Sequence, residues 1–169
     1  MREASRGWMR WLGLSAAVVV ADLATKAWIT HAFVPGDVLQ VTPFFNLVLT
    51  FNAGAAFSFL AGAGGWQRWF FTIVAAVISV VLVVMLRRPH RDRLVPLALS
   101  LVLGGALGNL WDRLTLGHVV DFVQLHAGGY YWPAFNVADS AISVGVVLLV
   151  WDAIRGTAKD TKDAKGVKA

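Results

Sequence analysis

The sequence predicts a membrane all-α fold: four transmembrane helices, with a small β-sheet cradle and a short helix on one side of the membrane. Three observations predict it, namely the composition, four long apolar segments and the distribution of basic residues. Of the 169 residues, 57% are hydrophobic and only 15% are charged, and the mean hydropathy is +0.64. A chain this short has too little interior to hide so much apolar surface from water, so we expect lipid to be its solvent.

Four apolar segments are long enough to cross a bilayer. They cover residues 8–33, 66–86, 94–111 and 137–154. A span takes ~20 residues and must be helical, because an open strand leaves backbone polar groups unpaired in hydrocarbon. A cleaved signal peptide is the weaker interpretation of the first segment. No small-x-small cleavage site follows its apolar run, and the segment continues through Asp22 and Lys26 to Phe33.

The basic residues predict the orientation of these spans. They gather before the first span, between the second and third, and after the fourth. These clusters are Arg2, Arg6 and Arg10; Arg87, Arg88, Arg91 and Arg93; and Arg155, Lys159, Lys162, Lys165 and Lys168. An even number of spans puts all three clusters on one side, and the positive-inside rule makes that side, with both termini, cytoplasmic. Basic residues beside apolar segments also argue against a nucleic-acid partner, despite the net charge of +5.

We therefore expect a single membrane domain over residues 1–155, followed by a disordered basic cytoplasmic tail over 156–169. Residues 34–65 and 112–136 would lie on the non-cytoplasmic side. Alternating apolar residues in 45–51 predict a strand, and the turn at Gly128–Gly129 predicts a hairpin that joins 118–125 to 130–132. Residues 52–60 are compatible with a short helix or with a loop.

Several kinds of catalytic chemistry have no support in the sequence. The chain has no cysteine, which excludes disulfides, thiolate metal sites and cysteine nucleophiles. It contains neither Gly-x-Ser-x-Gly nor His-Glu-x-x-His. The pair His118 and Asp121 has no neighbouring histidine to complete a metal site, and a serine–lysine pair of Ser58 or Ser140 with Lys26 has no supporting pattern. We expect no metal and no cofactor.

Polar residues inside the apolar segments need a partner or a function, because ionisable groups at membrane depth are costly. Asp22 and Lys26 are four residues apart on one helix face, which favours a salt bridge. Asn109 and Arg113 share that spacing, and Arg113 is compatible with binding a carboxylate or a lipid phosphate, or with snorkelling to the headgroups. Gly104 and Gly108 have the small-xxx-small spacing of packed helices.

Asp121 and Asp139 form the most unusual pair. The predicted topology puts both on the same, non-cytoplasmic membrane face at similar depth. Two carboxyl groups held close together in a low dielectric share a proton, so that one can act as a base toward water and the other as an acid. The residues alone leave two alternatives open: an N-cap role for Asp139, and a polar strand-edge position for Asp121.

Five blocks of sequence resemble the bacterial lipoprotein signal peptidases (signal peptidase II). They are DLATK at 22–26, NAGAAFS at 52–58, GGALGNLWDR at 104–113, GHVVDF at 117–122 and FNVADS at 135–140. Each block is weakly specific alone, but all five occur in the family's order and spacing, from the first span to the fourth.

The resemblance implies an aspartic endopeptidase of the bacterial inner membrane, with its active site facing the periplasm. Its substrate would be a diacylglyceryl prolipoprotein embedded in membrane lipid, cut just before the lipid-modified cysteine. The motif match makes Asp121 and Asp139 the catalytic pair. It assigns supporting or substrate-contacting roles to Asn52, Gly54, Asn109, Arg113, Asn136, Asp22 and Lys26. It also implies inhibition by globomycin-type cyclic peptides, and we expect a monomer.

Two other classes of function compete with this one. A small transporter or proton-conducting subunit would carry acidic residues through the depth of the membrane, whereas the second span has none. A purely structural subunit, assembled through Gly104 and Gly108, would tolerate asparagine at both aspartates. If the chain is a peptidase, we expect residues 35–65 to form a lid or cradle that excludes water during cleavage.

Overall fold

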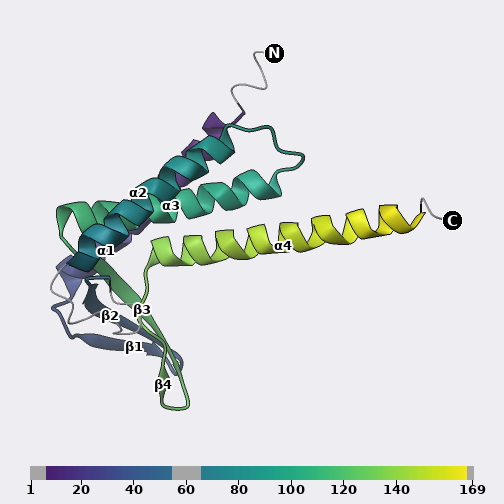
Figure 1. The fold of residues 1–169 in the computed structure, drawn as a ribbon. Helices are drawn as coiled ribbons and strands as arrows, with labels where there is room; N and C mark the ends of the chain where they lie inside the picture. The colour runs from purple at the N-terminus through teal and green to yellow at the C-terminus, as the bar shows by residue number, and fades with distance from the viewer. Residues whose placement is uncertain (1–6, 55–65, 167–169) are drawn as a thin grey trace.

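The computed structural model describes residues 7–54 and 66–166, with side chains described up to residue 156. Within these residues it contains four helices and one four-stranded sheet (Figure 1). The helices are α1 (Met9–Ala32), α2 (Trp66–Leu86), α3 (Leu94–Thr115) and α4 (Val137–Gly166). The strands are β1 (Val38–Thr42), β2 (Phe45–Asn52), β3 (Val119–Ala127) and β4 (Tyr130–Tyr131).

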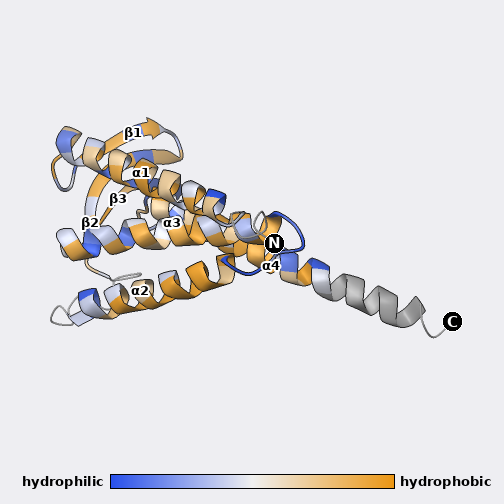
Figure 2. Cartoon of the chain, turned by 90° about the horizontal axis from the view of Figure 1, so that it is seen from above, coloured by the Kyte–Doolittle hydropathy of each residue, from blue (hydrophilic) through white to orange (hydrophobic). Residues whose placement is uncertain are grey.

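All four described helices are long and apolar enough to cross a membrane, which confirms the predicted spans. The 18-residue window of α2 is the most apolar, with a hydropathy of 2.8, and this helix is predominantly orange in Figure 2. Large apolar side chains such as Ile73, Val80 and Val147 are exposed on α2 and α4. Exposed apolar surface along membrane-length helices is the surface that lipid covers.

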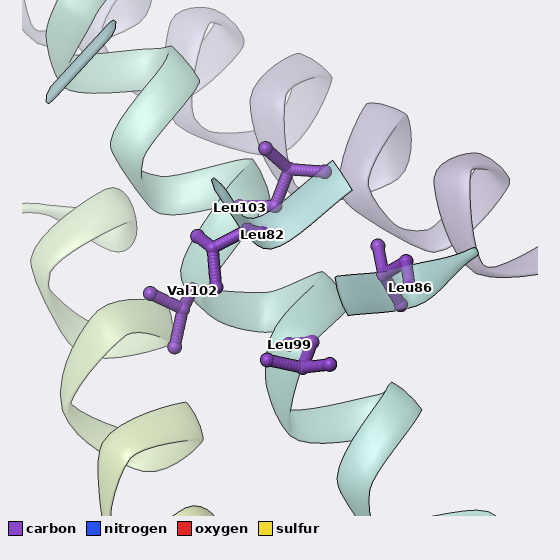
Figure 3. Close-up of a cluster of buried hydrophobic side chains, with 5 residues drawn as sticks. All are labelled: Leu82, Leu86, Leu99, Val102 and Leu103. Atoms are coloured by element: carbon purple, nitrogen blue, oxygen red, sulfur yellow. The ribbon is translucent and has the colours of Figure 1, made fainter. Parts of the chain in front are cut away.

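Helix α3 lies at the centre of the bundle and contacts each of the other three helices. Its glycines permit the close approach that their spacing predicts: a Cβ on Gly104 would meet Val18 and Ser15 of α1, and one on Gly105 would meet the backbone of α4. Leucines of α2 interlock with α3 on its other side (Figure 3). This cluster comprises Leu82, Leu86, Leu99, Val102 and Leu103.

Two helices continue beyond the ends of their apolar runs. Helix α3 ends at Thr115 rather than near Trp111, so it includes Asp112 and Arg113. The backbone of α4 stays helical to Gly166, in place of the predicted disordered tail after residue 155. The end of an apolar run predicts where a helix leaves the hydrocarbon of the membrane. The helix itself can continue for as long as its backbone hydrogen bonds form. The alanines and lysines of residues 157–166 are also good helix formers, so a helix that is already nucleated can continue through them.

The strands form one antiparallel sheet in the order β1-β2-β3-β4, at one end of the helices and away from the α2–α3 connection (Figure 1). The predicted strand over 45–51 and the hairpin at Gly128–Gly129 are both confirmed. A cluster of Ile29, Leu49, Val120 and Phe122 packs the sheet against the end of α1. The predicted short helix or loop over 52–60 lies, beyond Gly54, outside the described residues.

Candidate active site

The carboxyl groups of Asp121 and Asp139 are both hydrogen-bonded to one residue, Asn136, at the junction of the sheet and α4. Asp121 lies in β3 and is 2% exposed, whereas Asp139 lies half-buried in the first turn of α4. The Asn136 side-chain amide donates to Asp121 Oδ1 at 2.7 Å, and the Asn136 backbone N–H donates to Asp139 Oδ2 at 3.3 Å. A single residue therefore holds both carboxyl groups that the sequence singles out.

The start of α4 explains how Asn136 and Asp139 are oriented. The Asp139 backbone N–H donates to Asn136 Oδ1 at 2.8 Å, and the Asn136 N–H donates back to Asp139. This reciprocal pattern is a capping box, in which Asn136 is the N-cap and Asp139 is the third helical residue. The N-cap alternative for Asp139 is therefore wrong by three positions. Its carboxylate still lies at the positive end of the helix dipole, which favours negative charge.

Two further asparagines complete the hydrogen bonding of the carboxyl groups. Asn109, on α3, donates from Nδ2 to Asp139 Oδ1 at 2.7 Å. Asn52, at the end of β2, donates from Nδ2 to Asp121 Oδ2 at 3.1 Å. Its own Oδ1 accepts the N–H of Gly54 at 2.9 Å. Gly54 has a φ of +109°, and a Cβ there would lie 2.6 Å from the ring of Phe71, so glycine suits this turn on two counts.

A buried ion cluster lies directly behind the pair. Lys26 Nζ lies 2.7 Å from Asp22 Oδ2, which confirms the predicted salt bridge, and 2.9 Å from Asp112 Oδ2. It also donates to Asn109 Oδ1 at 3.1 Å. All four side chains are buried. Asp112 is not among the site residues predicted from the sequence, although its position three residues after Asn109, on the same helix face, is a signal that points to it.

Each acidic member of this cluster accepts a backbone N–H next to one of the paired aspartates. Asp112 Oδ2 accepts the N–H of Val120 at 3.1 Å, and Asp22 Oδ1 accepts the N–H of Ala138 at 2.9 Å. Both bonds are buried. The ion cluster therefore contacts both β3 and α4.

Arg113 lies beside the site without an ion pair to any carboxylate of the described residues. Its Nη1 donates to the backbone oxygen of Asn109 at 3.3 Å, and its guanidinium carbon lies 5.6 Å from the centre of the Phe71 ring. Its Nε is buried and has no hydrogen-bond partner within the described part of the chain. Arg113 thus retains an unused donor next to the paired aspartates.

Two mainly apolar cavities meet at Asp139. One, of about 510 Å³, lies between the sheet and α4, and its lining includes Asn52, Trp132, Phe135 and Val144. The other, of about 250 Å³, lies among α2, α3 and α4. Its lining residues are Phe71, Val74, Ala75, Ile78, Val102, Ala106, Asn109, Arg113, Asp139 and Ile142. Apolar walls with a few convergent polar groups are typical of a binding site for an apolar substrate.

The protonation of Asp121 follows from this environment. Burial, and next the negative charge of Asp139, raise the pKa of Asp121 to about 7, while hydrogen bonds from Asn52 and Asn136 oppose the rise. Near neutral pH the pair can therefore hold one proton, as predicted for two carboxyl groups in a low dielectric. No cluster of histidine, aspartate and glutamate suited to a metal ion occurs in the described residues.

Four membrane-length helices, with one aspartate of a pair at the start of α4 and the other in the adjoining strand β3, define the class: a multi-pass membrane protein with a carboxyl-pair site. The chain matches the family model described as signal peptidase (SPase) II over residues 14–155. It belongs to the signal peptidase II family, and is therefore a peptidase, as its five sequence blocks predict.

Known relatives agree with this assignment over nearly the whole chain. A lipoprotein signal peptidase of Burkholderia thailandensis is 53% identical over 145 residues, which cover 86% of this chain and 87% of that protein. One from Janthinobacterium sp. (strain Marseille) is 49% identical over 157 residues, covering 93% and 95%. A structure described as a bacterial membrane enzyme, obtained by the in meso method at 2.3 Å resolution, superposes with a TM-score of 0.79 at 34% identity. That match covers 89% of this chain and 90% of the other.

Proposed function

We propose that this protein is an aspartic endopeptidase that removes the signal peptide from diacylglyceryl-modified prolipoproteins, cutting before the lipid-modified cysteine. The observation that carries the proposal is the joining of Asp121 and Asp139 through Asn136 at the ends of the spans. The names of the relatives, lipoprotein signal peptidases, supply the substrate class.

In this mechanism Asp121 carries the shared proton and Asp139 is the base. The raised pKa of Asp121, about 7, suits a group that donates at neutral pH. Asp139 accepts two N–H groups at a helix N-terminus, an environment that suits a carboxylate. Asp139 takes a proton from water as the water oxygen bonds to the scissile carbonyl carbon, and Asp121 protonates the carbonyl oxygen. The C–N bond then breaks as the leaving nitrogen takes up the proton held by Asp139. One hydroxyl group of the intermediate returns its proton to Asp121 and becomes the carbonyl oxygen of the product acid, which restores both aspartates.

The cavities support this substrate class. A prolipoprotein combines an apolar signal helix with two acyl chains, so its scissile bond lies near the membrane surface. Both cavities are mainly apolar and reach Asp139: the one among α2, α3 and α4, and the one between the sheet and α4. A substrate with apolar groups on either side of the cleaved bond could fill both at once.

The location of the site supports an orientation. The α2–α3 connection carries Arg87, Arg88, Arg91 and Arg93. It lies at the end of the helices opposite the sheet (Figure 1). With the positive-inside rule, this favours a periplasmic site in the bacterial inner membrane, with both termini in the cytoplasm. Binding of globomycin-type peptides at the site and a monomeric state are further parts of the proposal.

The lid or cradle expected over residues 35–65 stays a prediction. Its described part, residues 35–54, includes β1 and β2 and brings Asn52 to Asp121. Residues 55–65 lie outside the described part of the chain. A cross-link between this segment and the helices that left turnover unchanged would contradict a moving lid.

The decisive experiment uses the purified full-length chain in detergent, a diacylglyceryl prolipoprotein and a gel-shift readout of cleavage. Asp121→Asn and Asp139→Asn should each lower kcat by at least about 1000-fold, because neither amide can replace an acid or a base. Asp152→Asn is the matched control: it lies on the same helix as Asp139, beside a cavity at the opposite end, and should leave kcat unchanged. Substantial cleavage by either of the first two folded variants would remove that residue from the mechanism.

A further inference from the structure

The two aspartates of the site belong to different elements, yet their backbones are anchored in the same way. The residue before Asp121 is Val120, whose N–H donates to Asp112 Oδ2 at 3.1 Å. The residue before Asp139 is Ala138, whose N–H donates to Asp22 Oδ1 at 2.9 Å. In each case a buried carboxylate of a membrane-spanning helix accepts the backbone N–H of the residue that precedes a site residue.

A single ammonium group joins the two anchors. Lys26 Nζ lies within 2.9 Å of both Asp22 and Asp112, which come from α1 and α3 respectively. Asp22, Lys26 and Asp112 are each at most 3% exposed. A buried ion cluster is a costly way to stabilise a fold, because well-packed apolar side chains can serve as well or better. The cost is explained if the cluster fixes a geometry that apolar packing would leave loose.

We propose that Asp22, Lys26 and Asp112 act as a positioning clamp, which sets the separation and orientation of Asp121 and Asp139 through the backbone of the preceding residues. The clamp touches neither of the reacting groups. Its effect is on the rate of the chemical step, since a displacement of ~1 Å in a catalytic group can cost ~100-fold in rate. This inference rests on the proposed function of the pair.

A substitution at Gly108 can disturb the clamp without changing any of its three residues. A Cβ at Gly108 would lie 2.6 Å from Asp22 Oδ2, so even one methyl group there must displace this carboxylate. The obstructed atom is the end of a flexible side chain, so the displacement is cheap for the fold. The small residue at 108, which the sequence analysis attributes to helix packing, thus leaves room for a carboxylate as well.

The first test measures kcat and KM for prolipoprotein cleavage by Asp112→Ala and Asp112→Asn. Alanine removes the acceptor for Val120 and one partner of Lys26, so kcat should fall about 10- to 100-fold while KM stays within about twofold. Asparagine can put its amide oxygen where Oδ2 lies and accept from both groups, so it should restore most of kcat. The clamp would be overturned by a wild-type kcat in the alanine variant, or by an equal loss in the asparagine variant.

Ser15→Ala is the matched control for loss of a buried polar contact. Ser15 Oγ donates to the backbone oxygen of Ser100 at 2.9 Å and so also joins α1 to α3, away from the ion cluster. Its removal should lower the midpoint of thermal unfolding and leave kcat unchanged. If Ser15→Ala lowered kcat as much as Asp112→Ala, the effect would be general loosening of the α1–α3 contact, and the proposal would be wrong.

The second test remains decisive if Asp112→Ala does not fold. Gly108→Ala should lower kcat about tenfold with little change in the unfolding midpoint, because it moves Asp22 without disturbing backbone packing. Gly145→Ala is its control: a Cβ there would meet the backbone oxygen of Ala98 at 2.7 Å, far from the clamp, and should cost stability but not kcat. A wild-type kcat in Gly108→Ala would refute the clamp.

These outcomes are separable from failure of the proposed function. If the wild-type chain does not cleave a diacylglyceryl prolipoprotein, or if the Asp121→Asn and Asp139→Asn variants do, the proposed function fails. If the wild type cleaves, both asparagine variants are inactive, and the Asp112 and Gly108 variants keep full kcat, then only the clamp fails.

Discussion

At the scale of single residues, the carboxyl group of Asp121 is governed by what surrounds it. Burial withdraws water from the charged form, and Asp139 adds a like charge, so the pKa rises to about 7. The side-chain amides of Asn52 and Asn136 act in the opposite direction, because they donate hydrogen bonds to the ionised form. The pKa of Asp121 therefore reflects opposing effects, and a single substitution can shift it.

Asn52→Ala should move the basic limb of the pH–kcat profile to higher pH. Loss of the Asn52 donor removes a stabiliser of ionised Asp121, so the pKa rises further and the protonated, active form persists to higher pH. The measurement is kcat between pH 5 and 9 with the prolipoprotein substrate. Asn46→Ala is the control, because Asn46 is a buried asparagine of the same strand that donates to Gln124 instead. A shift of the basic limb to lower pH would contradict the assignment of the proton to Asp121.

At the scale of an element, the end of β2 shows how a strand delivers a side chain to a site. Between Leu47 and Thr50 the pairing with β3 changes register, after which Thr50 lies opposite Asp121 and Asn52 opposite Val119. The chain then turns at Gly54, whose N–H holds the Asn52 side chain. The orientation of Asn52 toward Asp121 thus depends on a turn that favours glycine.

Gly54→Ala should reduce cleavage, whereas Gly36→Ala should not. Both glycines have positive φ, +109° and +95°, so each alanine costs about 1–3 kcal/mol of backbone strain. Only at Gly54 does the new Cβ also collide with Phe71; nothing lies within 4 Å of one at Gly36. We expect both variants to lower the unfolding temperature, Gly54→Ala more than Gly36→Ala, and at least a tenfold lower kcat for Gly54→Ala alone. Equal kcat values for the two variants would show that the turn does not position Asn52.

The accuracy with which the sequence predicts the ends of a helix depends on how sharply the composition changes there. The α2 span, residues 66–86, is bounded by a sharp change in composition, and its predicted limits match the structure. The last turn of α3 lies beyond the predicted span of 94–111 because Asp112 and Arg113 are charged, and charged residues after an apolar run suggest an exposed end. In the structure Asn109 and Asp112 are buried against α1, β3 and α4. These tertiary contacts give the polar side chains of the last turns buried partners, which the sequence does not show.

In the site, too, the contacts between elements could not be predicted from the sequence. Two aspartates on one face could be predicted from topology, and the family's sequence blocks supplied the asparagines. The sequence could not show that Asn136 bonds both carboxyl groups, because that depends on a capping box packed against β3. Nor does the sequence show what Asp112 pairs with, because its partner is a residue far away in the chain. The structure pairs Asp112 with Lys26 of another helix.

At the scale of the whole molecule, the sheet and the arginine-rich α2–α3 connection lie at opposite ends of the helices (Figure 1). The chain has no cysteine, so single cysteines can report on each end without background. In cells, a membrane-impermeant maleimide should label Tyr130→Cys, in β4, while the inner membrane is intact. It should label Pro89→Cys, in the α2–α3 connection, only after permeabilisation. Both positions are exposed. The reverse labelling pattern would show that the protein has the opposite orientation in the membrane, and would contradict the proposal.

The paired aspartates lie where membrane-length helices end, beside cavities with apolar walls. An enzyme with its site in this position meets its substrate by lateral diffusion in the plane of the membrane. The concentration that governs its rate is then substrate per lipid, not substrate per volume of water. At fixed amounts of enzyme and substrate, adding detergent should therefore slow cleavage by surface dilution, whereas changing the volume of buffer should have little effect. A rate that followed the buffer volume would indicate that the substrate reaches the site from water.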